Sequence, residues 1–573
     1  MRFFVLLFLG FCLTPLAAAA QIAQPARKND PCAQPIDGTI LPEPADLRSE
    51  NGVLKVQLTY TSFRDAHGQT RFCYRDQNGS QAPNLRLHPG DWLVLTLKND
   101  VNAAANSANA PHDHAAPSTG ACGNGAMDAF STNLHFHGLY VPPVCHQDDV
   151  LNTFISPSEP AFEYRLQVPA DQPPGVYWYH PHVHGFSNAQ VQGGASGALI
   201  VEGIECANPA VAGLPERVLI IRDQPVISPN AVQSASMVMP QIPILRDPDG
   251  DILNTGTGYG PPSKDLSINF VAVPYPDYPP ALILTKPGER QLWRVLNASA
   301  ITYLDLRLLF NGVPQPVGQV SLDGVPLNAH NTAGDKGPDN DGILWLNNVE
   351  LPPGARADLI VKGPPAGVYG NLITQAVDTG PAGENDPVRP LANIIATLKA
   401  PAPRSTLPAA PKVRTKQDAT WLGDVKPARV RRMFFSERPS DPANPNSPTV
   451  FMLTVEGHKE APYDANSTEP NLTVTVGDVE DWIIENRSKE LHAFHIHQLH
   501  FLLEEVNGQP VAEPFLRDIV NVGYWNGTDA KYPSVRLRMD FRNPNIAGTF
   551  VYHCHLLEHE DGGMMGTIRV TPK

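Results

Sequence analysis

Charged residues are scarce in this 573-residue sequence, and long apolar runs are scarcer still. Charged side chains make up 18% of the chain and the formal net charge is −15. This acidic balance argues against a nucleic-acid partner. After the first twenty residues no apolar run is long enough to cross a bilayer, so we expect no stable membrane anchor. The length exceeds what one hydrophobic core can organise and predicts three or four domains.

The first twenty residues have the pattern of a secretion signal. Arg2 precedes a mostly apolar stretch at 3–16, and small residues at 17–20 offer cleavage sites before Gln21. This leader carries no twin-arginine pair. We therefore expect residues 1–20 to be a signal peptide. The mature chain should be exported unfolded, periplasmic or secreted, and monomeric.

Cysteine is also rare, with seven residues in the chain. Cys12 leaves with the signal, and Cys554 belongs to a metal-binding pattern described below. In an oxidising compartment the remaining five can form at most two disulfides, which leaves one thiol. Cys122 with Cys145 is the best candidate pair, because the two bracket a single strand and loop. The pairing among the five stays open: Cys32, Cys73, Cys122, Cys145 and Cys206.

Long amphipathic helical patterns are hard to find, and short strand-like runs take their place. The 59 prolines and 44 glycines are scattered, and between them lie alternating runs rich in Val, Leu, Ile, Tyr and Thr. Examples are residues 53–61, 92–98, 282–284 and 472–476. Short strands separated by turn residues indicate an all-β protein built from sandwiches or barrels.

One pattern occurs three times at wide spacing. The segments read LHPGDWLVLTLKN from residue 87, TKPGERQLWRVLN from 285 and TVTVGDVEDWIIEN from 473. Each is a strand, a glycine turn carrying an acid, and a second strand ending near Asn, which suggests three copies of one β-domain. With limits near Cys206 and in the proline-rich stretch 401–416, we predict domains at 21–205, 206–402 and 403–573. Residues 101–127 look like a surface insertion.

Histidine, in contrast, is concentrated in a few short stretches of the sequence. Of nineteen histidines, twelve fall in four clusters. They read HFHG at 135–138, HPHVHG at 180–185, HAFHIHQLH at 492–500 and HCHLLEHEDGGMM at 553–565. One His-X-His pair alone would be better explained by a zinc site or by buried core histidines. Four such clusters together favour copper.

The last cluster predicts two different metal centres on one strand. Neighbouring side chains of a strand point to opposite faces, so His553 and His555 face one way and Cys554 the other. Cys554, His559 and Met564 are spaced five residues apart. A thiolate, two imidazoles and a weak axial Met form a blue-copper electron-transfer site, and His492 is the natural second imidazole.

The other pairs supply a second set of imidazoles. On a strand each His-X-His pair lies on one face. The eight histidines are too many for one metal ion and suit three coppers, two held by three imidazoles and one by two, with open positions for dioxygen. The set is His135, His137, His180, His182, His495, His497, His553 and His555.

The four motifs, in this order, resemble those of the multicopper oxidase family, and the chain is most similar to its three-domain bacterial laccase-like members. The resemblance implies three cupredoxin-like Greek-key β-sandwich or barrel domains and four copper ions. It assigns the type 1 copper to Cys554, His492 and His559 with Met564 axial, and the type 2 copper to His135 and His495. The two type 3 coppers fall to His137, His180, His182, His497, His553 and His555.

Several neighbouring residues have roles outside the ligand set. Glu560 matches a family position for proton supply, and Asp148 matches a second one less closely, with Asp149 as the alternative. Met565 competes with Met564 for the axial position, although the family spacing favours Met564. We interpret His184 and His500 as supporting or structural residues. We expect His146 to be a loop residue. His112 and His114 in the insertion are better explained as surface residues than as an extra copper site.

These patterns predict an oxidase with dioxygen as acceptor and a small reducing substrate, a phenol or an aromatic amine, as donor. A second hypothesis is an oxidase of cuprous, ferrous or manganous ions. The chain has no methionine-rich segment, which counts against a dedicated cuprous oxidase. A third hypothesis is a non-catalytic copper-binding protein on the same fold, but every family ligand is present.

Overall fold

The computed structural model describes residues 31–573 except 33, 102–121, 124–126, 158, 228–243, 249, 329–341, 410–419, 512 and 514. The predicted signal peptide and most of the 101–127 insertion, with His112 and His114, therefore lie outside the described residues. The predicted all-β class is confirmed: the described strands form six sheets, and the helices are single turns or little more. Among the described residues no helix is long and apolar enough to cross a membrane.

The first two sheets come from the N-terminal third of the chain. One has the order β1-β4-β9-β8-β6 and the other β3-β2-β5-β7. Their strands are β1 (Asp46–Arg48), β2 (Val53–Arg64), β3 (Thr70–Asp76), β4 (Asn84–Leu87), β5 (Trp92–Asn99), β6 (His135–His137), β7 (Phe162–Gln167), β8 (Gly175–His180) and β9 (Gly197–Val201). Helices α2 (Ser187–Gln192) and α3 (Ile204–Ala207) and the 3-10 turn η2 (Pro209–Val211) follow in this region.

The middle of the chain forms the second pair of sheets. One sheet has the order β12-β11-β10-β14-β21-β17-β18, and β19 pairs with β17 and β24 with β10. The other has the order β13-β23-β22-β15-β16, and β20 pairs with β15. The strands are β10 (Pro215–Gln224), β11 (Asp265–Ile268), β12 (Val271–Val273), β13 (Ala281–Thr285), β14 (Arg290–Asn297), β15 (Leu304–Phe310), β16 (Val313–Gln315), β17 (Val317–Leu322), β18 (Val325–Pro326), β19 (Leu344–Leu346), β20 (Val349–Leu351), β21 (Arg356–Lys362), β22 (Tyr369–Thr374), β23 (Arg389–Ala396) and β24 (Ser405–Thr406).

The C-terminal part forms the third pair, with orders β26-β25-β28-β34-β30-β31, β32 beside β30, and β27-β36-β35-β29-β33. The strands are β25 (Arg429–Pro439), β26 (Thr449–Val455), β27 (Leu472–Thr475), β28 (Val479–Asn486), β29 (His492–Ile496), β30 (Phe501–Val506), β31 (Gln509–Pro510), β32 (Leu516–Arg517), β33 (Ile519–Val522), β34 (Ser534–Asp540), β35 (Gly548–Cys554) and β36 (Met565–Thr571). Short turns η3 (Leu422–Asp424) and η4 (Pro544–Ile546) and helix α5 (Leu557–Asp561) complete it.

The three repeated segments occupy equivalent places in the three pairs. They form β4–β5, β13–β14 and β27–β28, and in each case the two strands belong to the two different sheets of one pair. The turn glycines Gly90, Gly288 and Gly477 have φ of 93°, 69° and 98°, a left-handed conformation that glycine adopts without a steric cost. The repeated pattern therefore marks the point where the chain crosses between facing sheets.

The asparagine that ends each repeat has a structural reason. Asn99, Asn297 and Asn486 are buried, and each side-chain amide donates to two main-chain carbonyls beyond its own strand. Each side-chain oxygen also accepts the main-chain N–H two residues later. A buried amide must satisfy its donors and acceptor, so these side chains fix the path of the loop that leaves the strand.

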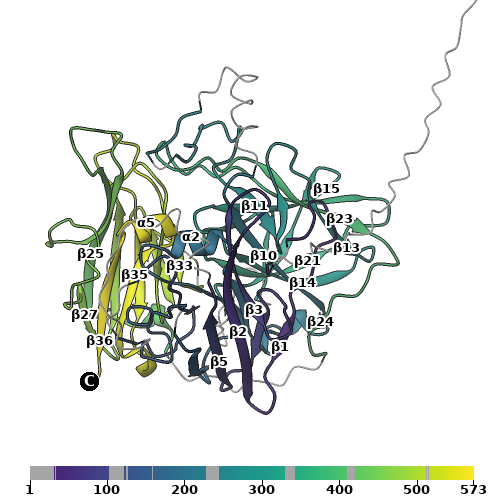
Figure 1. Cartoon of the computed structure of the whole chain (residues 1–573), viewed down its shortest axis with the longest axis horizontal. Coiled ribbons are helices and arrows are strands. Elements are labelled where there is room, and N and C mark those ends of the chain that lie inside the picture. The colour runs from purple at the N-terminus through teal and green to yellow at the C-terminus, as the bar shows by residue number, and fades with distance from the viewer. Residues whose placement is uncertain are drawn as a thin grey trace, which may run out of the picture.

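Each pair encloses its own apolar core because alternate residues point inward. In β7, for example, Phe162, Tyr164 and Leu166 are buried and the residues between them are exposed. The third core extends beyond its own sheets, because Val191 of α2 and Tyr303 of the middle region pack into it. In Figure 1 the third pair lies to one side in green and yellow, and α2 and α5 lie next to each other between it and the rest.

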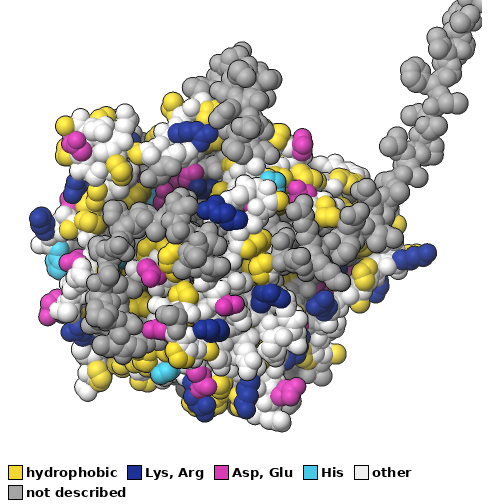
Figure 2. Space-filling view, viewed as in Figure 1, with side chains coloured by type: hydrophobic (Ala, Val, Ile, Leu, Met, Phe, Trp, Pro, Cys, Tyr) yellow, Lys and Arg dark blue, Asp and Glu magenta, His cyan; other side chains and the backbone are white. Residues whose placement is uncertain are grey.

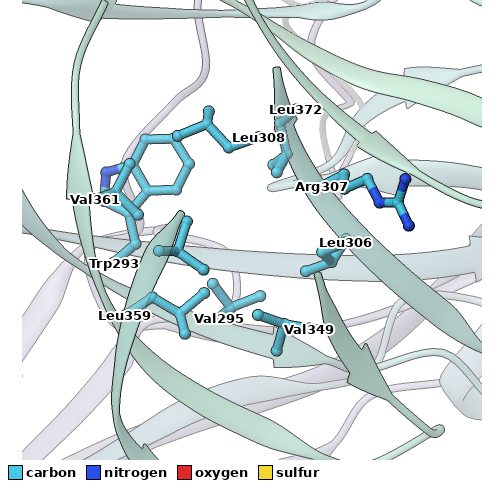
Figure 3. Close-up of a pocket in the computed structure, with 10 residues that line it drawn as sticks. Trp293, Val295, Leu306, Arg307, Leu308, Val349, Leu359, Val361 and Leu372 are labelled. Atoms are coloured by element: carbon cyan, nitrogen blue, oxygen red, sulfur yellow. The ribbon is translucent and has the colours of Figure 1, made fainter. Parts of the chain in front are cut away.

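A small apolar space remains inside the second pair. Trp293, Leu306 and Leu359 line it, and Figure 3 shows the guanidinium of Arg307 directed away from it. A space without converging polar groups has no chemistry to offer a substrate. On the molecular face seen in Figure 2, acidic and basic side chains are interspersed.

The predicted count of disulfides is confirmed. Cys122 pairs with Cys145, as expected, and Cys32 pairs with Cys73. Cys206 is the thiol left outside the two disulfides, together with the buried Cys554.

Candidate metal centres

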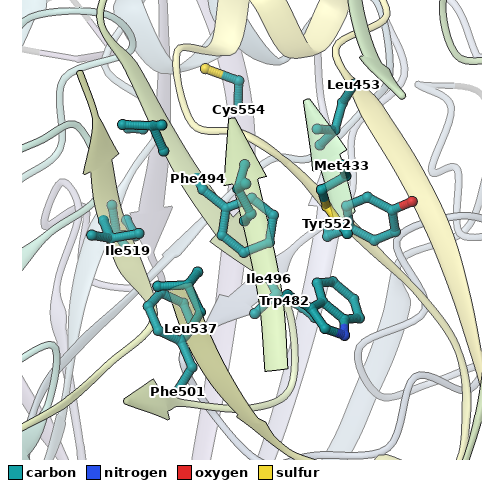
Figure 4. Packing of buried hydrophobic residues seen from close by; sticks show 14 of the residues in the cluster. Met433, Leu453, Trp482, Phe494, Ile496, Phe501, Ile519, Leu537, Tyr552 and Cys554 are labelled. Carbon is teal, nitrogen blue, oxygen red and sulfur yellow. The ribbon is translucent and has the colours of Figure 1, made fainter. Parts of the chain in front are cut away.

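The first candidate centre lies inside the third pair of sheets. Cys554 ends β35, His492 begins β29 and His559 lies in α5. The Cys554 Sγ lies 3.6 Å from His492 Nδ1 and 3.8 Å from His559 Nδ1, and the two Nδ1 atoms are 3.2 Å apart. Figure 4 shows Cys554 at the end of its strand with its sulfur directed away from the packed rings below. Three buried donor atoms therefore converge on one point.

Main-chain hydrogen bonds tie the loop after Cys554 to this centre. The Met564 N–H donates to the His559 carbonyl at 2.8 Å, and the Cys554 N–H donates to the Met564 carbonyl at 3.0 Å. Met564 shares the apolar core that contains Cys554, whereas Met565 packs with Val150 and Val551. This packing favours Met564 as the residue that faces the centre.

The second candidate centre lies between the first and third pairs. Strand pairing places His135 opposite His180, and His495 opposite His553. Rings from the two ends of the chain then stack: His135 on His497 with centroids 3.7 Å apart, and His137 on His495 at 4.0 Å. The structure brings all eight predicted histidines together in one set of ring contacts, and each is at most 2% exposed.

The nitrogen atoms of this cluster show what it can bind. His180 Nδ1 lies 2.9 Å from the Pro181 carbonyl, and His553 Nδ1 lies 2.8 Å from the Cys554 carbonyl. A carbonyl partner requires a protonated nitrogen, which leaves the other nitrogen with a lone pair. Seven ring nitrogens of the cluster have no hydrogen-bond partner among the described residues: His135 Nε2, His137 Nδ1, His180 Nε2, His495 Nε2, His497 Nδ1, and both Nδ1 and Nε2 of His555. Buried ring nitrogens that lack a hydrogen-bond partner are suited to bind a metal ion.

Burial also keeps the imidazoles in the form that binds metals. It lowers the pKa of His180 to about 3 and the pKa of His553 to about 4, and it lowers the pKa of the other cluster histidines as well. Neutral imidazole is the ligand form, so the cluster requires no deprotonation at neutral pH. Burial raises the pKa of the Cys554 thiol and so favours its protonated form. A bound metal ion would have to displace this proton in order to be held by the thiolate.

The two centres are joined through three consecutive residues. The His553 ring lies in the eight-histidine cluster, with centroid distances of 5.3 Å to His495 and 5.4 Å to His497. The next side chain, Cys554, contacts His492 and His559 instead. His555 returns to the cluster and lies 5.1 Å from His137. The strand alternation expected from the sequence therefore connects the centres through one backbone segment.

Two of the expected carboxylates contact the cluster. Asp148 Oδ2 lies 3.0 Å from His135 Nδ1, and Asp148 accepts the Phe136 N–H at 2.8 Å. Glu560 lies 3.6 Å from His182 Nδ1 and 3.5 Å from His553 Nδ1. Burial raises the pKa of both carboxyls well above the ordinary value. The alternative, Asp149, bonds Asn152 instead.

The remaining histidines take different places. His500 is buried and its Nε2 lies 2.8 Å from the Asp323 carbonyl, which is a structural contact. His184 packs edge-on against Tyr463. His146 lies beside the Cys122–Cys145 disulfide, and its Nδ1 is 2.6 Å from the Glu163 carbonyl.

Sequence reasoning missed the carboxylates around the first centre. Glu437 Oε1 lies 3.0 Å from His492 Nε2, and Glu490 Oε1 lies 3.4 Å from His559 Nε2. The Ser488 hydroxyl is 2.8 Å from the same His492 nitrogen. Glu490 and Ser488 lie just before the third histidine cluster, and this nearness was the available signal. Glu437 is on β25, fifty-five residues earlier, where no pattern marks it.

Sequence reasoning also missed an ion pair beside the second centre. Arg356 of β21 binds both oxygens of Asp518 at 2.7 Å, and Asp518 Oδ1 lies 3.3 Å from His137 Nε2. Neither residue belongs to a histidine motif, and only tertiary structure brings them there.

Comparison with known proteins agrees with this geometry. Two family models, both described as multicopper oxidase, match residues 124–205 and 442–573, and these ranges hold all four histidine clusters. A multicopper oxidase of Staphylococcus haemolyticus is 24% identical over 558 residues, covering 95% of each chain. A laccase of Bacillus subtilis is 22% identical over 457 residues, 77% of this chain and 80% of that protein.

Solved structures show the same fold. The multicopper oxidase McoA of Aquifex aeolicus superposes with a TM-score of 0.62 at 18% identity, covering 93% of this chain and 99% of the other. A multicopper oxidase of Campylobacter jejuni, described as a metallo-oxidase, superposes with a TM-score of 0.60 at 22% identity. The superposition covers 96% of this chain and 99% of the other. The cupredoxin-like sandwich architecture is therefore confirmed. Both family models found in the chain are described as multicopper oxidase, and relatives of that name align along almost its whole length, so the chain is similar to multicopper oxidases from end to end.

Proposed function

We propose that the protein couples the one-electron oxidation of a reducing substrate at a type 1 copper to the four-electron reduction of dioxygen to water at three further coppers. His492, Cys554 and His559 would hold the type 1 copper with Met564 axial, His135 and His495 the type 2 copper, and the six other cluster histidines the type 3 pair. The observation that carries this proposal is the His553-Cys554-His555 segment, which touches both donor sets.

Copper bound at the two sets would supply the one-electron redox chemistry. The chain supplies the rest: buried neutral imidazoles, a covalent path through Cys554, and exclusion of water around both sets. Reduction of dioxygen to two waters consumes four protons. Glu560 and Asp148 are placed to deliver them, because their raised pKa keeps protons available at the edge of the cluster.

For the donor we propose a phenol or an aromatic amine, as the sequence predicts. Glu437 supports this choice because its carboxylate lies against the outer nitrogen of His492. A phenol loses a proton as it loses an electron, and a carboxylate at the copper ligand can accept that proton.

A second candidate is a metal-ion oxidase, and one observation favours it. Glu490 is buried beside the first centre, where burial and the charge of Glu437 raise its pKa while a hydrogen bond with Glu384 lowers it. The buried Glu384 has a pKa raised by its own burial and by the charge of Glu490. Glu437 and Glu490 thus place carboxylate oxygens against His492 and His559. Oxygen donors suit ferrous or manganous ions better than cuprous ion, which prefers sulfur.

We further propose that the mature chain is exported to the periplasm or secreted, and that its three sheet pairs are domains with limits 21–205, 206–402 and 403–573. Two disulfides suit an oxidising compartment.

Oxygen consumption by the copper-loaded protein tests the function. We would supply a phenol, an aromatic amine, ferrous ion and cuprous ion in turn. Turnover with the phenol or the amine supports the first candidate, and turnover with ferrous ion alone supports the second. A fully copper-loaded protein that consumes no oxygen with any donor would contradict both and favour the non-catalytic hypothesis.

Glu437→Gln tests whether this carboxylate serves the donor site. Loss of a charged contact costs about 1.5–3 kcal/mol, so we expect kcat/KM for ferrous ion to fall by roughly 10-fold or more if the carboxylates bind the ion. The matched control is Glu485→Gln on β28, whose carboxylate pairs with Arg487 and Arg432 away from the histidines. Equal kcat/KM in both variants would exclude Glu437 from the donor site.

A further inference from the structure

A buried ion pair connects the middle sheets to the histidine cluster. Arg356 begins β21, and its two terminal nitrogens donate to the two oxygens of Asp518 at 2.7 Å each. Both residues are fully buried. Such a two-point contact fixes the plane of the carboxylate as well as its position. The Arg356 and Asp518 main-chain N–H groups both donate to Asp323, so backbone contacts hold the pair as well.

Asp518 in turn contacts both halves of the cluster. Its Oδ1 lies 3.3 Å from Nε2 of His137, which comes from the first pair of sheets. Its main-chain carbonyl lies 2.8 Å from Nδ1 of His495, which comes from the third pair. One residue therefore orients two rings that stack on each other at a centroid distance of 4.0 Å.

The contact also selects which nitrogen of His137 faces the cluster. A carboxylate only accepts hydrogen bonds, so the His137 nitrogen beside it carries the proton. The lone pair is then on Nδ1, which has no hydrogen-bond partner among the described residues. For His495 the carbonyl of Asp518 holds Nδ1 and leaves Nε2 available.

Two glycines show how closely the surrounding structure fits this arrangement. A Cβ at Gly138, directly after His137, would lie 2.6 Å from Arg356 Nη2 and 2.8 Å from Asp518 Oδ2. A Cβ at Gly354, just before β21, would lie 2.7 Å from the His555 ring. Both have φ of +86°. The middle sheets therefore pack closely against the cluster, although they supply none of its predicted ligands.

We propose that Asp518, held by Arg356, is the positioning residue through which the middle sheets set the orientation of His137 and His495 for copper binding. The proposal deepens the proposed function and rests on it. It predicts that the ion pair controls how tightly the cluster holds its metal and leaves the Cys554 centre unchanged, because His492, Cys554 and His559 make none of the contacts described for Asp518 and Arg356.

Asp518→Asn tests this with a matched control. Asp358→Asn changes a fully buried carboxylate on β21, the strand that carries Arg356, and this carboxylate faces Arg294 at 3.0 Å instead of the histidines. In each variant the arginine keeps a second carboxylate: Glu216 for Arg294 and Asp323, at 3.7 Å, for Arg356. The two substitutions should therefore cost similar stability, measured as Tm of the copper-loaded protein.

The readouts are copper content during titration with a chelator, the blue absorption band, and electron paramagnetic resonance. Loss of an outer partner of a metal-bound histidine lowers metal affinity by about 10- to 100-fold. We expect this loss for the cluster copper in Asp518→Asn, with an unchanged blue band, and no loss in Asp358→Asn. Cluster affinities that are equal in the two variants overturn the proposal.

Arg356→Lys covers the case in which Asp518→Asn does not fold. It keeps both charges but loses the two-point contact, since lysine is a single point charge. We expect a smaller fall in cluster affinity, again with the blue band retained, and wild-type affinity overturns the proposal. A wild-type protein that binds no copper would instead contradict the proposed function, so the two failures are distinguishable.

Discussion

The two candidate centres differ in how much of the chain each one needs. The Cys554 centre takes its donors from β29, β35 and α5, all within the third pair of sheets. The eight-histidine cluster takes half of its rings from the first pair and half from the third, and His137 also depends on Asp518 and on Arg356 of the middle pair. One centre is local, and the other forms only when three parts of the chain dock.

The difference teaches where each function can be lost. Damage to the docking of the sheets should remove dioxygen reduction first and leave electron acceptance at the Cys554 centre. Damage to the Cys554 centre should remove the blue colour and stop the supply of electrons to an intact cluster. The predictions below test this separation, beginning with the largest expected effect.

Cys554→Ser should remove the blue band and all oxidase activity. The strong red absorption of such a site comes from a copper–thiolate bond, and a serine hydroxyl cannot replace the thiolate. The fold should remain, because the substitution is close in size and the cluster ligands are untouched. Visible absorption, circular dichroism and oxygen consumption check this, and a variant that stays blue would refute the ligand assignment.

His495→Leu should break the cluster and spare the other centre. The type 2 copper would lose one of its two predicted imidazoles, while His492, Cys554 and His559 keep their contacts. Substrate should still bleach the blue band without oxygen, but reoxidation by air should nearly stop. Stopped-flow absorption under anaerobic and then aerobic conditions measures both steps. Loss of the blue band itself would place His495 at the wrong centre.

Glu560→Gln should slow only the step that needs protons. The carboxyl lies between His182 and His553, and general acid catalysis contributes about 10²- to 10⁴-fold. We expect reoxidation by dioxygen to slow by roughly 100-fold while anaerobic bleaching keeps its rate. Asp149→Asn is the matched control, since Asp149 bonds Asn152. Equal reoxidation rates in both variants would remove Glu560 from the proton path.

Met564→Leu should have the smallest effect. The axial thioether bond is weak and tunes the potential of the copper, so its loss should raise the reduction potential and keep the blue band. A shift on the order of 60 mV, equivalent to a tenfold change in a one-electron equilibrium, is expected. A redox titration measures it. Met565→Leu is the control, because Met565 packs with Val150 and Val551, and a shift in that variant alone would move the axial assignment by one residue.

The sequence predicted the local features well. Strand geometry alone determines the repeats around Gly90, Gly288 and Gly477 and the alternation at residues 553–555. Both features could therefore be predicted from the sequence pattern. Asp148 and Glu560 could be expected because they lie close in sequence to histidine motifs.

Contacts between distant segments left no such pattern. Asp518 contacts His137 across 381 residues, and Glu437 contacts His492 from the other sheet of the third pair. Their places follow from how the sheets dock, which periodicity does not encode. The second disulfide, Cys32–Cys73, was open for the same reason.

Copper content combined with electron paramagnetic resonance tests the central claim most directly, that one chain holds a local centre and a separate three-copper cluster. In the oxidised wild-type protein we predict four coppers per chain, of which two give a resonance signal. The type 3 pair should be silent, because two adjacent cupric ions couple their spins. One copper per chain, or a signal from every copper present, would contradict the claim.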